Sequence, residues 1–129
     1  MRAKIGFVVL TNNPLVLRQY DELKLVPVDG DAEEVYIKAR NLVHKGHRLL
    51  SHPLSGNIKP GLAPYRTIVL TEEADRTVDL DSLNYMSAAL EAVQRTGRRA
   101  AETIPAAILN DYAAVDLSIF ESALLSLQA

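Results

Sequence analysis

The sequence predicts an α/β fold, with a small, mostly parallel sheet of three to four strands covered by helices and a helical C-terminal third. Short apolar runs rich in β-branched residues alternate with stretches of helical period, which is the order that βαβ units produce. Residues 100–129 are instead rich in alanine and leucine. At 129 residues, of which 48% are hydrophobic and 23% charged, the chain suits one domain over residues 1–129.

Four short segments have the composition of strands. Residues 4–10 (KIGFVVL) form a continuous apolar run typical of a buried parallel strand, and residues 23–28 (LKLVPV) suggest a second strand. Pro27 cannot donate to a ladder, so we expect it near the end of that strand or at an edge. Residues 48–50 suggest a brief third strand, and residues 66–70 (RTIVL) a further one.

Capping residues predict where three helices begin. An asparagine followed by proline predicts a short helix over residues 14–20. Asp31 opens a sequence that resembles a capping box, and Gly46 is placed to end that helix. Asp79 or Asp81 caps a third helix, whose apolar residues recur on one face.

The tail is predicted to form two helices, a short one beginning at Pro105 and a last one after a turn near residues 110–111. One face of the last helix carries four large apolar residues: Leu117, Phe120, Leu124 and Leu127. The tail holds more apolar residues than one stripe against a sheet requires, which predicts a homodimer through the C-terminal helices or docking on a larger partner. The alternative is a three-layer fold that buries these helices on two sides at once.

Composition argues against several functional classes. The absence of cysteine excludes disulfides, thiolate metal sites and a cysteine nucleophile. No apolar run approaches the ~20 residues that span a bilayer, and no signal peptide precedes the first strand-like run, so we expect a cytoplasmic protein without a membrane contact. The net charge of −2 argues against nucleic acid as a partner. The loop over residues 11–14 has no glycine, so a dinucleotide is not expected, nor any other cofactor.

Charge is unevenly distributed along the chain. Residues 1–66 carry more basic than acidic side chains, and residues 67–129 the reverse. The stretch from residue 35 to residue 71 contains no Asp or Glu, although it holds six Lys and Arg residues and all three histidines. Such a stretch is typical of a site for a carboxylate, a phosphate or an acidic partner, and the alternative is a solvated basic face.

The predicted topology also indicates a site within residues 35–71, because ligands of open α/β sheets bind outside the carboxyl ends of the strands. Three loops are predicted there, at residues 11–14, 51–64 and 71–73, and the second is long and rich in Pro and Gly. The candidate ligand-binding residues are Asn12, Asn13, His52, Ser55, Gly56, Asn57, Lys59 and Arg66.

These residue types suit a small anionic ligand. Lys59 would supply charge, Ser55 and Asn57 directional donors, and Gly56 a close approach of the backbone. The two asparagines would form the opposite wall. The alternative interpretation is a turn-rich loop that uses Gly and Asn for backbone angles, with the asparagines serving to cap a helix.

The histidines allow a second hypothesis, an enzyme that uses His52 as general acid/base on a carboxylate or phosphate substrate. A carboxylate to orient His52 would have to come from Glu72 or Glu73, and His47 could support the site. A metal is not expected, because the spacing of the histidines is poor and the stretch offers no carboxylate ligand.

Three stretches together resemble the GrdX family: TNNP at residues 11–14, a long run at residues 39–60 and PYR at residues 64–66. The strongest part is the stretch over residues 44–60, whose core is GHRLLSHPLSGNIKP. Members are small proteins encoded beside the glycine, sarcosine and betaine reductase components of amino-acid-fermenting anaerobes. The resemblance therefore implies a cytoplasmic accessory protein with reductase components as partners, and it brings no catalytic residues.

Overall fold

A computed structural model describes residues 6–53, 63–96 and 104–128 of the chain. Its sheet has the order β2-β1-β3, with β1 over Phe7–Thr11, β2 over Leu25–Pro27 and β3 over Thr67–Thr71. The helices are α1 (Pro14–Gln19), α2 (Ala32–His44), α3 (Leu80–Thr96) and α4 (Ala106–Gln128). The α/β class and the helical C-terminal part are therefore confirmed.

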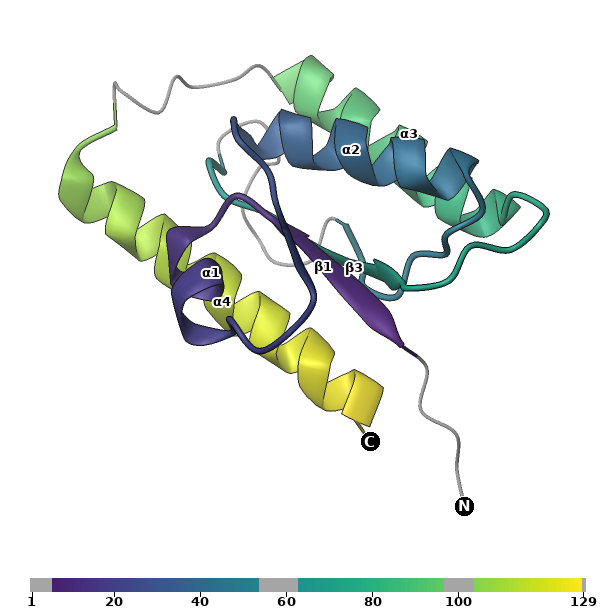
Figure 1. The fold of residues 1–129 in the computed structure, drawn as a ribbon. Coiled ribbons are helices and arrows are strands. Elements are labelled where there is room, and N and C mark those ends of the chain that lie inside the picture. The colour runs from purple at the N-terminus through teal and green to yellow at the C-terminus, as the bar shows by residue number, and fades with distance from the viewer. Residues whose placement is uncertain (1–5, 54–62, 97–103, 129) are drawn as a thin grey trace.

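The helices cover the two faces of the sheet, α2 and α3 on one and α1 and α4 on the other (Figure 1). Strand β1 distributes its side chains accordingly, because successive residues of a strand point to opposite faces. Leu10 packs with α2 and α3, whereas Val9 packs with α1 and α4. Tyr20, which follows α1, meets Phe120 of α4 edge-on, with the ring centroids 5.2 Å apart.

The strand directions correct one detail of the prediction, since the sheet is mostly antiparallel. β1 and β2 are parallel, but β3 runs antiparallel to β1, with Thr11 opposite Thr67 and Phe7 opposite Thr71. A parallel strand requires a crossover, usually a helix, and the Pro- and Gly-rich connection before β3 has no helical pattern in its sequence. The chain instead returns beside the segment that precedes this connection.

That preceding segment, residues 48–51, lies along the outer edge of β3. The strand predicted there is reduced to one bridge, between Leu49 and Leu70. Side chains replace two further ladder bonds: the N–H of Arg48 donates to Thr71 Oγ1 at 2.8 Å, and the N–H of Val69 donates to Ser51 Oγ at 2.9 Å. These side-chain acceptors explain why the segment does not continue as a regular strand.

The predicted helix caps are confirmed. Asn13 accepts a hydrogen bond from Leu15 N–H at the start of α1, and Asp31 accepts one from Glu34 N–H at the start of α2. Asp79, rather than Asp81, caps α3 by accepting from the N–H of Ser82. Each cap satisfies a backbone N–H that has no partner within its own helix.

The tail differs from the prediction, because α4 is one continuous helix and does not turn near residues 110–111. Asn and Asp inside a helix cost at most about 0.7 kcal/mol each, and both side chains are exposed here. The predicted apolar face is confirmed and packs on the chain's own sheet, with Phe120 and Leu124 buried. That face is thus covered within the protomer, and the homodimer stays a prediction. Of the helices described, none has the length and hydropathy to cross a membrane.

We predict that Gly46→Ala destabilises the fold far more than Gly30→Ala. Both glycines have positive φ, +109° at Gly46 and +135° at Gly30. A Cβ at Gly46 would lie 2.0 Å from the carbonyl oxygen of Asp75, which is backbone, whereas a Cβ at Gly30 would meet only the flexible side chain of Glu34. We expect a loss of about 3 kcal/mol or more for Gly46→Ala and about 1 kcal/mol for Gly30→Ala in urea denaturation. Equal losses would contradict the assigned contact.

Candidate functional site

Asn12, directly after β1, hydrogen-bonds through its side chain to the turn before α2 and to the segment before β3. Its Nδ2 donates to the carbonyl oxygens of Gly30, at 3.1 Å, and Pro64, at 2.8 Å. Its Oδ1 accepts from the N–H of Arg66 at 2.9 Å. The side chain therefore holds the turn before α2 and the segment before β3 against the end of β1.

Asn13 links the same end of the sheet to α4. While its Oδ1 caps α1, its Nδ2 donates to the carbonyl oxygen of Ala113 and to Asp116 Oδ2, both at 2.9 Å. Asn13 is fully buried. The capping role predicted as one alternative is thus confirmed, and both ends of the amide are engaged within the protein.

A chain of hydroxyl groups reaches the same carboxylate from the strands. The N–H of Asn13 donates to Thr11 Oγ1 at 3.0 Å, the hydroxyls of Thr11 and Thr67 are 2.7 Å apart, and Thr67 donates to Asp116 Oδ2 at 2.7 Å. Because the hydrogen of Thr67 points to the carboxylate, the hydroxyl of Thr11 must donate to Thr67. The ends of β1 and β3 are thereby joined to α4.

Asp116, like Thr11 and Thr67, was not predicted from the sequence. It is only 5% exposed, and burial raises the pKa of its carboxyl group above the ordinary value of 3.8. The hydrogen bonds from Asn13 and Thr67 and the charge of Arg66 lower the pKa, but they do not outweigh burial. The sequence does contain a sign of its burial, because Asp116 is an acidic residue on the apolar helix face that runs from Ala113 to Leu124.

Arg66 also lies at this end of the sheet, because β3 runs antiparallel to β1, and it is buried, with 4% exposed. Its positive charge acts on Asp116 and on Tyr36 of α2. The hydroxyl of Tyr36 donates to the carbonyl oxygen of Pro53 at 2.7 Å. Burial raises the pKa of Tyr36 to about 12 although Arg66 opposes it, so the phenol stays protonated and keeps this hydrogen bond.

Four predicted site residues, Ser55, Gly56, Asn57 and Lys59, lie outside the described residues. The residues that flank their segment are held in place. Tyr36 binds the carbonyl of Pro53 on one side, and Asn12 binds the carbonyl of Pro64 on the other. Both approaches to the segment are therefore fastened by residues that cluster around Arg66.

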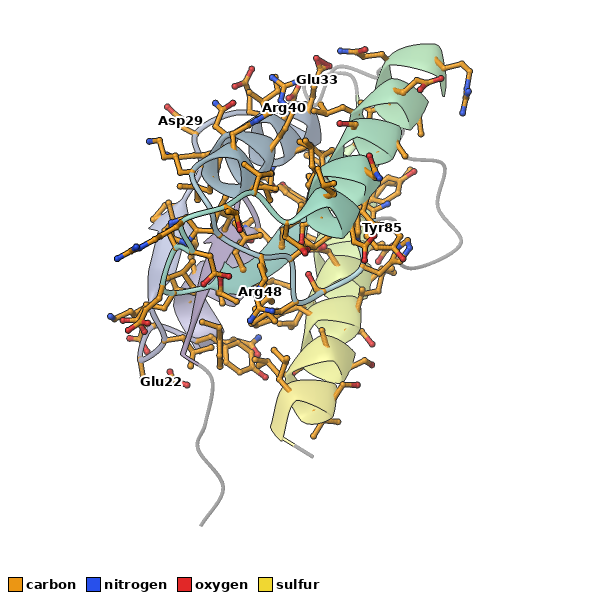
Figure 2. All side chains as sticks on the ribbon, turned by 90° about the vertical axis from the view of Figure 1, so that its right-hand side faces the viewer. Glu22, Asp29, Glu33, Arg40, Arg48 and Tyr85 are labelled. Carbon is orange, nitrogen blue, oxygen red and sulfur yellow. The ribbon has the colours of Figure 1, made fainter. Side chains whose placement is uncertain are left out.

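His52 is exposed at the outer edge of the sheet, and its ring centroid is 5.6 Å from that of Tyr85. Figure 2 shows Tyr85 on α3. The prediction that Glu72 or Glu73 could orient it is wrong. The antiparallel direction of β3 sends both to the opposite end of the sheet, where Glu72 N–H donates to the carbonyl of Gly6.

The three histidines are not brought together. Nδ1 of His47 is 2.8 Å from the carbonyl oxygen of Thr71, at the end of the sheet opposite Arg66, so His47 does not support the predicted site. His44 is exposed at the end of α2. Within the described ranges, no group of three or more His, Cys, Asp or Glu side chains could hold a metal ion.

The fold and the site define a small three-layer α/β protein with a buried polar cluster at one end of its sheet. The chain belongs to the GrdX-like protein family, whose model matches residues 8–125. That match includes the strands, the polar cluster and most of α4, and it confirms the resemblance seen in the sequence. Membership supports an accessory protein of the glycine reductase type. No curated protein and no solved structure matches the chain significantly.

We predict that Asp116→Asn changes how stability depends on pH. Because the folded pKa of Asp116 is raised, the folded state binds its proton more tightly than the unfolded state. The stabilisation that comes from this tighter proton binding is complete at a pH below 3.8, the pKa of the unfolded state. It is lost as the pH rises through the higher pKa of the folded state. Urea denaturation should therefore show the stability of Asp116→Asn improving relative to wild type as pH rises above about 4.

Asp116→Ala is the control, because Asn13 and Thr67 both donate to Oδ2, which an asparagine can mimic and an alanine cannot. It should cost about 3 kcal/mol by leaving two buried donors unsatisfied. A pH dependence identical in wild type and Asp116→Asn would refute the raised pKa.

Proposed function

We propose that this protein is an accessory or regulatory protein of the glycine reductase system, and that it binds a small anionic ligand where β1 ends and β3 begins. The observation that supports this best is Arg66, a buried cation at the sheet end to which both flanks of the segment over residues 54–62 are fastened. Its partners would be this ligand and components of the reductase.

Each candidate residue has a role in this proposal. The guanidinium of Arg66 suits a carboxylate or phosphate, to which it can donate two parallel hydrogen bonds. Lys59 adds charge, Ser55 and Asn57 donate, and Gly56 allows close approach of the backbone. His52 opens the segment, while Asn12 and Asn13 hold the surrounding walls through the hydrogen bonds described above.

No observation favours the alternative, an enzyme that uses His52 as general acid/base. Its predicted orienting carboxylates, Glu72 and Glu73, lie at the opposite end of the sheet. Its exposed ring lies beside Tyr85. Ligand binding without turnover therefore accounts better for the site.

Anion binding should raise the melting temperature, since a ligand that binds only the folded state stabilises it. The probes for a thermal-shift experiment, each at millimolar concentration, are the anions phosphate and acetyl phosphate and the zwitterions glycine and betaine, which each present a carboxylate. At a concentration 100 times the dissociation constant we expect about 2.7 kcal/mol of stabilisation. If none of the four raises the melting temperature, the ligand-binding proposal is wrong.

Lys59→Gln should abolish the shift, whereas Lys45→Gln, at the exposed end of α2, should leave it intact. Both substitutions remove one positive charge, so their comparison separates a site contact from a change in net charge. A shift lost equally in both variants would indicate non-specific electrostatics.

A further inference from the structure

A cavity lies between residues 50–52 at the outer edge of the sheet and the C-terminal part of α4. Its volume is about 400 Å³. Cavities of this size lie within the range of small-molecule sites, which begins at roughly 300 Å³. We name it the edge cleft.

Four polar side chains line the edge cleft: Ser51, His52, Ser122 and Ser126. Ser51 Oγ already accepts a hydrogen bond from Val69 N–H, so its own hydrogen is left to donate. Ser122 and Ser126 are four residues apart on α4 and therefore lie on one face of that helix. None of the lining residues is acidic.

The backbone adds a further donor at Ser51. Residues 48–51 pair with β3 through the carbonyl of Arg48 and the N–H of Leu50, so the backbone groups of Leu49 and Ser51 point away from β3. The N–H of Leu49 is used by Ser82. Within the described part of the chain, nothing accepts the N–H of Ser51.

The rest of the lining is apolar. Leu50 packs against the cluster that contains Val69 and Phe120, and Ile119 is half-buried on α4. Ala123 also faces the cleft, where its small side chain leaves room. The edge cleft thus combines neutral hydrogen-bond donors with an apolar wall, which matches a ligand that has an accepting head and a short apolar body.

We propose that the edge cleft binds a short-chain carboxylate, with its head at Ser51 and Ser122 and its chain against Leu50, Ile119 and Ala123. The lining has no carboxylate to pair with a cation. Phosphate has no apolar part to contact the apolar wall, and its charged oxygens would be desolvated there. Ser122 lies six residues before Gln128, the end of α4, so the head is clear of the negative helix terminus, whose effect falls off within one turn. The two proposed sites share His52, but the proposal for the edge cleft does not rest on the site proposed at Arg66.

Butyrate is the probe for an NMR titration of the isotope-labelled protein, with phosphate and n-butylammonium as comparisons. We expect saturable amide shifts at residues 50–52 and 119–126 with butyrate only. Ala123→Leu should fill the edge cleft and abolish these shifts, whereas Ala114→Leu, at an exposed position of α4, should leave them unchanged. The double variant Ser122→Ala and Ser126→Ala should weaken butyrate binding about tenfold, as loss of a hydrogen bond or two predicts.

Three outcomes would overturn the inference: no saturable shift at these residues, shifts that persist in Ala123→Leu, or equal shifts with n-butylammonium. Lys59→Gln separates the two proposed sites. Butyrate shifts that vanish in Lys59→Gln and persist in Ala123→Leu would assign the anion to the Arg66 site and refute the edge cleft. Shifts that survive Lys59→Gln would support the edge cleft even if the Arg66 site binds no anion.

Discussion

One buried carboxylate, Asp116, holds together the end of the sheet on which the rest of the structure depends. Through Oδ2 it accepts from Asn13, which caps α1, and from Thr67, which begins β3 and is bonded to Thr11 at the end of β1. Burying a charge is unfavourable unless the charged group is paired and hydrogen-bonded. The donors that stabilise the carboxylate of Asp116 lie next to β1 and in β3, so these hydrogen bonds also fix α4 on the sheet. The long tail is thereby a part of the core and of the site.

Local signals in the sequence predicted most of the elements. Asp31 and Gly46 mark the two ends of α2 through a cap and a positive φ, and both signals can be recognised from residue type and position alone. The direction of β3 depends on which strand it meets, which is not a local property. The continuity of α4 through residues 110–111 likewise follows from its packing on the sheet, which outweighs two weak helix formers.

Asn12 and Asn13 follow β1 as the sequence predicts, but Arg66 meets them only because β3 runs antiparallel, a direction that the sequence did not predict. That this end of the sheet binds an anion stays a prediction. Thr11 and Thr67 were missed because each reads as an ordinary β-branched strand residue, and only the register between the two strands pairs their hydroxyls.

The antiparallel direction of β3 also places the acidic residues that follow this strand and the basic residue that precedes it at opposite ends of the sheet. It sends the acidic residues that follow the strand to the far end, where Glu72 pairs with Lys24 and Asp75 lies 3.5 Å from Arg48. It brings the start of β3 beside the end of β1, so that Arg66 faces Asp116 within the buried cluster. A parallel β3 would have placed Glu72 and Glu73 beside the end of β1, where their charges would repel an anion, and would have sent Arg66 to the opposite end of the sheet. The direction of one strand is therefore what keeps the proposed anion site basic.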